Sequence, residues 1–84
     1  MITDILSFYN ITDFELHGRS RRPQVVEARQ MSWLMLQQAG YTLEQIGAIY
    51  NRDRSTVHSG IKHIKGIIET DKKTREFYNR LNKQ

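Results

Sequence analysis

The most regular hydrophobic pattern in the chain lies in its second half. Four β-branched apolar residues recur there at intervals of three and four positions: Val57, Ile61, Ile64 and Ile68. This spacing places them in one stripe along an α-helix, and such a stripe packs against the rest of a protein. The opposite side of the same helix carries hydrogen-bond donors and positive charges: Arg54, Ser55, His58, Ser59, Lys62 and Lys65. The pattern predicts a helix with a buried side and a polar, basic side.

A shorter helix is predicted just before it. Thr42 suits the N-cap, and Gln45 three residues later completes a capping box. Gly47 inside this helix costs about 1 kcal/mol relative to alanine, so we expect the second helix to come close to it. Asn51 tolerates the positive φ that a tight turn needs. These features predict a helix-turn-helix over about residues 42–69.

The N-terminal part predicts two short helices and a loop. Apolar spacing over residues 2–9 indicates an amphipathic helix, and Thr12 opens a further helical turn with Glu15 as its capping partner. The following stretch, HGRSRR at residues 17–22, combines a glycine and dense positive charge with no apolar spacing. We therefore expect an exposed basic loop.

A long central helix is predicted from Pro23 to Ala39, with Gly40 as its C-terminal cap. Its apolar positions cover most of the circumference, so we expect it to be the most buried helix, with Trp33 in the core. Phe77 and Leu81 indicate a last helix after residue 70 that folds back onto the core. The fold class predicted is all-α, a compact domain of five to six helices.

Length and charge narrow the possible functions. The 84 residues suffice for one domain, residues 1–84, with no room for a nucleotide-binding or catalytic domain besides. Thirteen basic and nine acidic residues give a net charge of +4, and the positive excess is concentrated in residues 18–29 and 52–66. Two such blocks are typical of a protein that holds a polyanion at two points.

Other classes are disfavoured by what the sequence lacks. There is no cysteine for a disulfide or a thiolate metal site, and no apolar run approaches the roughly 18–20 residues of a membrane span. The acidic N-terminus lacks the basic start of a secretory signal. We expect a cytoplasmic, nucleoid-associated protein without membrane contact, cofactor or small-molecule substrate.

Two segments carry a more specific signal: RDRSTVHSG at residues 52–60 and GRSRRPQVVEARQ at residues 18–30. Together they resemble the C-terminal DNA-binding domain of the DnaA family, the bacterial replication initiators, over nearly the whole chain. That family has a basic loop, a helix with an ARQ-like sequence, an isoleucine-glycine pair and a signature of the form GGRDHTTVLHA. The counterparts here are Arg21 and its neighbours, Ala28-Arg29-Gln30, Ile46-Gly47 and residues 52–57.

The resemblance implies an all-helical fold of the DnaA domain IV and Trp repressor kind, bound to an asymmetric duplex site. Its signature helix would lie in the major groove and an arginine of the basic loop, here Arg21, in the adjacent minor groove. The family positions that face bases correspond to Asp53, Arg54 and Ser55. The position that holds phosphate corresponds to Thr56. Two basic positions near the DNA backbone correspond to Arg29 and Arg52. The candidate DNA-binding residues are Arg19, Arg21, Arg22, Arg29, Arg52, Asp53, Arg54, Ser55, Thr56, His58, Ser59 and Lys62.

The chain departs from the family signature at informative positions. Arg54 stands where the family has histidine, and Ser55 stands where it has threonine. A guanidinium donates readily to O6 and N7 of guanine, whereas serine lacks the methyl group that contacts thymine. We therefore predict a shifted base preference at the positions that these residues face. The family's ATPase domain has no counterpart in these 84 residues.

Several alternatives fit parts of the pattern. A plain helical hairpin with a solvated outer side also has this periodicity, but such a side normally mixes charges of both signs. Asp53 suits an N-cap as well as a contact to a base. A protein-interaction module of a replication complex or a transcriptional regulator would use the same domain. Single-stranded nucleic acid or RNA binding ranks last, because aromatic residues interleaved with the basic ones are missing from the proposed face.

Catalysis and metal binding find little support in the sequence. Ser55 and His58 lack an acid to complete a nucleophilic triad, and no oxyanion motif is present, so we expect no enzyme. His58 and His63 are five positions apart and project from different sides of a helix, which does not suit zinc.

Overall fold

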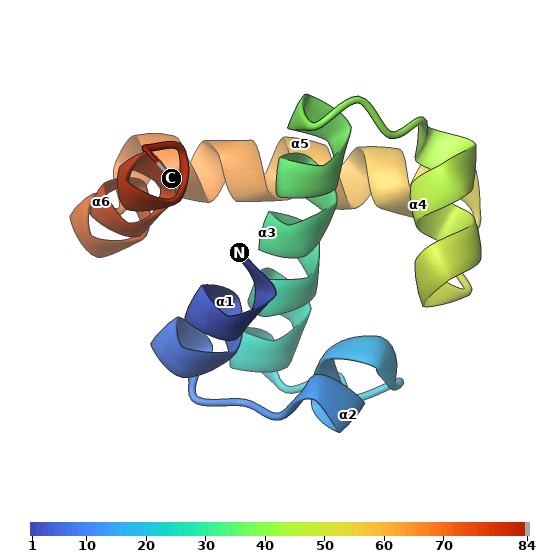
Figure 1. Cartoon of the computed structure of the whole chain (residues 1–84), viewed down its shortest axis with the longest axis horizontal. Coiled ribbons are helices and arrows are strands. Elements are labelled where there is room, and N and C mark those ends of the chain that lie inside the picture. The colour runs from blue at the N-terminus through green and yellow to red at the C-terminus, as the bar shows by residue number, and fades with distance from the viewer. Residues whose placement is uncertain (84) are drawn as a thin grey trace.

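The computed structural model describes residues 1–83 and forms six α-helices there (Figure 1). The helices are α1 (Ile2–Tyr9), α2 (Asp13–His17), α3 (Pro23–Gln38), α4 (Leu43–Tyr50), α5 (Arg54–Thr70) and α6 (Lys72–Leu81). The all-α prediction is thereby confirmed for these residues. Within them, no helix combines the length and the apolar character needed to cross a lipid bilayer.

Helix α3 occupies the centre of the fold and packs against α1, α2, α4 and α5. Figure 1 shows α5 crossing α3, with α4 beside the first turns of α5 and α6 at its other end. Seven residues of α3 are buried: Val25, Ala28, Arg29, Met31, Ser32, Trp33 and Leu34. The prediction that this is the most buried helix is confirmed, because each of the other helices has fewer buried residues. One of the seven is an arginine, which the apolar pattern alone does not explain.

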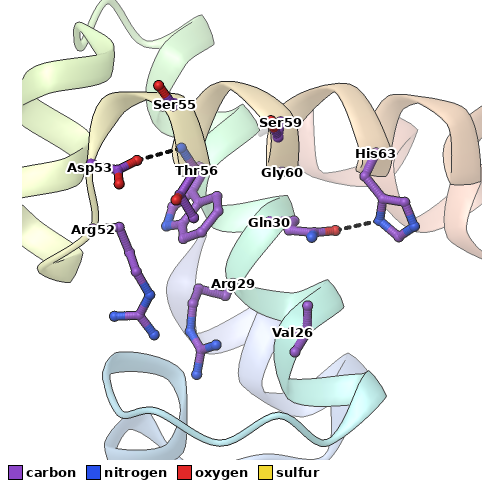
Figure 2. Close-up of a pocket in the computed structure, with 11 residues that line it drawn as sticks. Val26, Arg29, Gln30, Arg52, Asp53, Ser55, Thr56, Ser59, Gly60 and His63 are labelled. Carbon is purple, nitrogen blue, oxygen red and sulfur yellow. Dashed lines mark hydrogen bonds between the residues drawn. The ribbon is translucent and has the colours of Figure 1, made fainter.

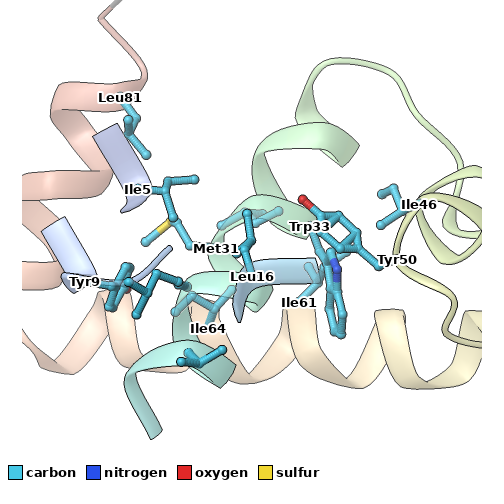
Figure 3. Close-up of a cluster of buried hydrophobic side chains, with 14 of the residues drawn as sticks. Ile5, Tyr9, Leu16, Met31, Trp33, Ile46, Tyr50, Ile61, Ile64 and Leu81 are labelled. Carbon is cyan, nitrogen blue, oxygen red and sulfur yellow. The ribbon is translucent and has the colours of Figure 1, made fainter. Parts of the chain in front are cut away.

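The apolar stripe of α5 packs inward as predicted. Val57, Ile61 and Ile64 are at most 3% exposed, and Ile68 near the end of the helix is partly buried. Figure 3 shows Ile61 and Ile64 in one cluster with side chains of α1, α2 and α3. Burial of three such side chains stabilises the fold by about 1.5–3 kcal/mol each. Helix α5 is therefore fixed by one side, which leaves the other side in solvent.

Both predicted capping boxes are present. The hydroxyl of Thr12 accepts a hydrogen bond from the Glu15 amide at 3.1 Å, and the Glu15 carboxylate accepts one from the Thr12 amide at 3.0 Å. The equivalent distances between Thr42 and Gln45 are 3.1 and 2.9 Å. Asn51, with φ of 55°, ends α4 in the left-handed conformation that the sequence predicts. The starts of α2 and α4 are therefore determined by residues three positions apart.

The end of α3 is a Schellman motif. Gly40 has φ of 107°, and its amide donates to the carbonyl of Gln37 at 3.0 Å. The Tyr41 amide donates to the carbonyl of Leu36 at 3.1 Å. Only glycine adopts such a φ without strain, which is why the chain can turn here into α4.

The reason expected for Gly47 needs correction. A Cβ atom at this position would lie 2.3 Å from the carbonyl oxygen of Arg52, so the turn itself, and not α5, makes the close approach. The close contact between α3 and α5 occurs instead at Gly60. A Cβ there would lie 2.4 Å from Cζ3 of Trp33.

A single aspartate joins α5 to α6. The Asp71 amide donates to the carbonyl of Ile67 at 2.8 Å, and its carboxylate accepts a hydrogen bond from the Thr74 amide at 2.9 Å. Phe77 and Leu81 of α6 are buried, as the sequence predicts for the last helix.

We predict opposite effects for alanine at two glycines of α5. Gly60→Ala should lower the free energy of unfolding by about 1–3 kcal/mol, because the methyl group would overlap the buried indole of Trp33. Gly66→Ala meets nothing within 4 Å and should raise it by up to about 1 kcal/mol, since alanine favours helix. Urea denaturation followed by circular dichroism measures both. Equal effects of the two substitutions would contradict the packing described.

Candidate nucleic-acid interface

The start of α5 is set by Asp53. Its carboxylate accepts a hydrogen bond from the Thr56 amide at 2.7 Å, and its φ of −76° and ψ of 163° are those of an N-cap. This bond to the Thr56 amide is the main reason why the pKa of Asp53 lies below its usual value. The side chain is exposed. Asp53 is thus an N-cap that also borders the exposed side of the helix.

The exposed side of α5 opposes the buried stripe. We call it the outer face, and it consists of Arg54, Ser55, His58, Ser59 and Lys62, all of them exposed. These residues lie four apart along the helix in two adjacent rows, so they form one continuous surface. All five side chains can donate hydrogen bonds, and none is acidic. Thr56, also exposed, lies next to this face at the first turn.

An acid from α4 reaches this face. The Glu44 carboxylate lies 3.3 Å from Nε of Arg54, and both side chains are exposed. The sequence shows no acid between residues 54 and 65, but it does not show that Glu44 comes beside Arg54. The start of the outer face is therefore an ion pair and not an isolated cation.

A groove of about 560 Å³ runs between α3 and α5 beside the outer face (Figure 2). Its walls are lined by Val26, Arg29, Gln30 and Trp33 on one side and by Arg52, Asp53, Ser55, Thr56, Ser59, Gly60 and His63 on the other. A hydrogen bond of 2.7 Å between Nδ1 of His63 and the Gln30 side-chain oxygen links the two helices across it (Figure 2). The sequence does not point to this pair, since 33 residues separate its members.

The structure corrects the role expected for Arg29. Its side chain is 5% exposed, and its three nitrogens donate to backbone carbonyls at 2.9–3.2 Å. The acceptors are Glu15, Leu16 and Ser20, which belong to the end of α2 and the basic loop. Burial, and then the charge of Arg52, lower the pKa of Arg29. We therefore assign Arg29 to holding the basic loop, in place of the role near the DNA backbone that the family resemblance implied.

Arg52 has a similar position at the turn of the helix-turn-helix. It donates to the carbonyl of Tyr50 at 2.7 Å and to the carbonyl of Gly18 at 2.9 Å. Figure 2 shows Arg29 and Arg52 side by side, both directed away from α5. The bond to Gly18 ties the turn to the basic loop across 34 residues of sequence. Arg52 is partly exposed, so it lies nearer to solvent than Arg29.

The basic loop lies between α2 and α3. Arg19 and Arg21 are exposed, whereas Arg22 forms an ion pair with Glu15. The loop and its two anchoring arginines enclose a hollow of about 250 Å³, which shares Val26, Arg29 and Arg52 with the groove beside α5. Arg52, the first residue of the second basic block, is thereby brought beside the basic loop of the first block.

A short helix, a tight turn and a second helix with one buried and one exposed side define a helix-turn-helix protein. The family model described as the bacterial DnaA protein helix-turn-helix matches residues 1–64, and the chain belongs to this family. The family resemblance seen in the sequence is thereby confirmed.

Two curated relatives carry the name chromosomal replication initiator protein DnaA. The protein of Oleidesulfovibrio alaskensis is 34% identical over an alignment of 86 positions, which covers 98% of this chain and 18% of the relative. The protein of Flavobacterium psychrophilum is 33% identical over an alignment of 88 positions, which covers 99% of this chain and 18% of the relative. The chain therefore spans less than a fifth of the length of either relative.

The assignment of Arg29 leads to a stability prediction. Arg29→Ala should lower the free energy of unfolding by about 1–3 kcal/mol, because it removes the donors of three partly or fully buried hydrogen bonds. Arg29→Lys should recover only part of the loss, since an ammonium group cannot reproduce the planar fork. Thermal unfolding gives the stabilities, and amide hydrogen exchange of residues 18–22 reports on the loop. An unchanged exchange rate in Arg29→Ala would contradict the anchoring role.

The N-cap leads to a prediction about pH. Because the folded pKa of Asp53 is depressed, its contribution to stability is present above the ordinary aspartate pKa of about 3.9 and is lost as pH falls through the folded pKa. Asp53→Asn keeps a capping oxygen but does not titrate. The difference in unfolding free energy between the wild type and Asp53→Asn should therefore shift in favour of the variant as pH falls from 6 to about 2. A difference that is constant with pH would argue against the described cap.

Proposed function

We propose that this chain binds duplex DNA at a specific sequence, with α5 in the major groove and the basic loop in the adjacent minor groove. The observation that carries the proposal is the outer face of α5. It presents five donor side chains to solvent, while the opposite stripe of the same helix is buried. The major groove is about 12 Å wide and admits an α-helix. Membership in the DnaA helix-turn-helix family supports the same function.

The outer face supplies groups that suit base edges. Arg54 is at the start of the helix, where its guanidinium can donate to O6 and N7 of a guanine. Ser55 and the exposed Asp53 carboxylate lie beside it, and the latter can accept a hydrogen bond from a cytosine amine. His58, Ser59 and Lys62 extend the face for two further turns. The hydroxyl of Thr56, at the rim of the groove beside α5, suits a phosphate oxygen.

The basic loop supplies a second contact. Arg19 and Arg21 are exposed at its tip, and the loop is anchored to the same two arginines that border the groove beside α5. An exposed arginine is the side chain most often found in a narrow minor groove, so Arg21 is assigned to that groove. Arg19 and Arg22 are assigned to phosphates. Such a two-point contact sets the orientation of the domain on an asymmetric site.

The biological role that we propose is in DNA replication initiation or its regulation, in the bacterial cytoplasm and without catalysis by this domain. The names of the two relatives support this role. A second candidate is docking on another protein, and the exposure of Phe14 at 87% favours it. Phe14 belongs to α2, the helix that directly precedes the basic loop. A partner of a replication complex could contact it without any base readout.

Selection of bound duplexes from a random pool tests the proposal. We expect an enriched sequence and an affinity that falls steeply with salt, because each phosphate contact releases counterions. Arg54→Ala should relax the preference at one base pair by roughly 5- to 100-fold, as loss of a bidentate contact does. Lys62 offers a point charge that suits a phosphate oxygen, so Lys62→Ala should weaken all sequences about equally and reduce the slope of log affinity against log salt by about 1.

Two results would contradict DNA binding as the function. One is a pool without enrichment, or an affinity that ignores salt. The other is full cellular function in the double variant Arg54→Glu with Lys62→Glu, since two acids on the outer face repel the DNA backbone. If Phe14→Ser abolishes function while that double variant does not, docking on a protein is the function.

A further inference from the structure

We infer that Glu44 is a specificity-determining residue that acts through Arg54. By holding the guanidinium at Nε, it leaves the two Nη groups to donate to a single guanine. Glu44 is thus a positioning residue on α4 for a base contact made by α5. The inference rests on the proposed function, because it assumes that Arg54 contacts a base.

The backbone on both sides of this pair is fixed by capping. Glu44 lies in the first turn of α4, whose start is held by the hydrogen bonds between Thr42 and Gln45. Arg54 is the first residue of α5, directly after the N-cap Asp53. A carboxylate in the first turn of a helix also interacts favourably with the helix dipole, so this position suits an acidic side chain. The ion pair, with 3.3 Å between Nε of Arg54 and the Glu44 carboxylate, therefore connects two side chains whose backbone positions are well defined.

The chemistry of arginine explains what this contact leaves free. A guanidinium has five N–H groups in a fixed plane, and the Glu44 carboxylate lies as an ion-pair partner on its Nε side. The four on Nη1 and Nη2 point away from the stem and can form the fork that matches O6 and N7 of guanine. Beside the pair, Leu43, Arg54, Ser55, His58 and Ser59 line an open hollow of about 400 Å³. A base edge can therefore approach Arg54 from this side.

The contact is weak in the free protein. The two side chains are 68% and 62% exposed, and ion pairs in solvent contribute little to stability. On a duplex, water leaves the interface and the local dielectric falls, so the same pair becomes stronger when Arg54 meets a base. The restriction of Arg54 to one orientation is therefore most effective in the bound state, where it favours guanine over bases that cannot accept two hydrogen bonds.

A second effect follows from the charge of Glu44. An acid beside the outer face repels the phosphate backbone, so it lowers the affinity for every duplex alike. Only a site that offers the partner of Arg54 compensates for this repulsion. Glu44 therefore raises the sequence specificity in two ways: it positions Arg54 for the contact with guanine, and it weakens binding to other sequences.

Competition binding with the selected site tests this inference. The competitors carry each of the other three base pairs at the position that Arg54→Ala relaxes. We expect Glu44→Ala to bind random duplexes more tightly and to lower the preference for guanine by roughly three- to tenfold. Glu44→Gln should keep more of this preference than Glu44→Ala, because its amide oxygen can accept a hydrogen bond from Nε although the charge is gone.

Two controls separate positioning from charge. Glu76→Ala removes one exposed acid from α6, which lies at the opposite end of α5 from Arg54, so it should leave the base preference unchanged. In the Arg54→Ala background, Glu44→Ala should leave the base preference unchanged, since a residue that acts through Arg54 has no effect once Arg54 is absent.

The possible failures are distinguishable. If the wild type selects no sequence, the proposed function itself fails. If Arg54→Ala relaxes one base pair and Glu44→Ala does not change that preference, the inference fails while the proposed function stands. If Glu44→Ala lowers the preference equally with and without Arg54, Glu44 contacts the DNA by itself, which also overturns the positioning role.

Discussion

Gly60 of α5 lies against the buried indole of Trp33 on α3, and this contact sets how near the two helices come. Because there is no side chain at residue 60, the stripe of Val57, Ile61 and Ile64 reaches the core along its length. The orientation of α5 about its own axis follows from that burial. Packing therefore determines which residues of α5 face solvent. The outer face is exposed because the apolar stripe on the opposite side is buried.

The second determinant is the buried fork of Arg29. A charged side chain is costly to bury unless its donors are all used, and here backbone carbonyls accept from each nitrogen. Arg52 repeats the arrangement from the turn of the helix-turn-helix, with a bond to Gly18. Arg29 and Arg52 belong to the basic residues that suggest nucleic-acid binding, yet both side chains stabilise the fold by binding backbone carbonyls. They place the exposed arginines of the loop beside the groove along α5.

Much of the fold could be predicted from short-range patterns. The stripe of α5 and the capping pairs at Thr12 and Thr42 lie within one or a few helical turns, so the chain alone determines them. The role of Arg29, the bond between Gln30 and His63, and the ion pair of Glu44 could not be predicted in this way. They depend on how α3, α4 and α5 cross, and a sequence pattern does not state crossing geometry. The prediction that Gly47 lies close to α5 was wrong for the same reason, because the nearest atom to a Cβ there belongs to the turn.

Glu15 connects three of these elements, since its carboxylate caps α2 and pairs with Arg22 while its carbonyl accepts from Arg29. The loop between α2 and α3 is consequently tied down at Gly18 and Arg22 and also in its middle at the carbonyl of Ser20, so mainly the exposed side chains of Arg19 and Arg21 have freedom to lose. A loop anchored in this way is already ordered when the domain folds, so binding a partner costs it little further conformational entropy. In this respect the loop differs from the disordered basic arms that become ordered only on association.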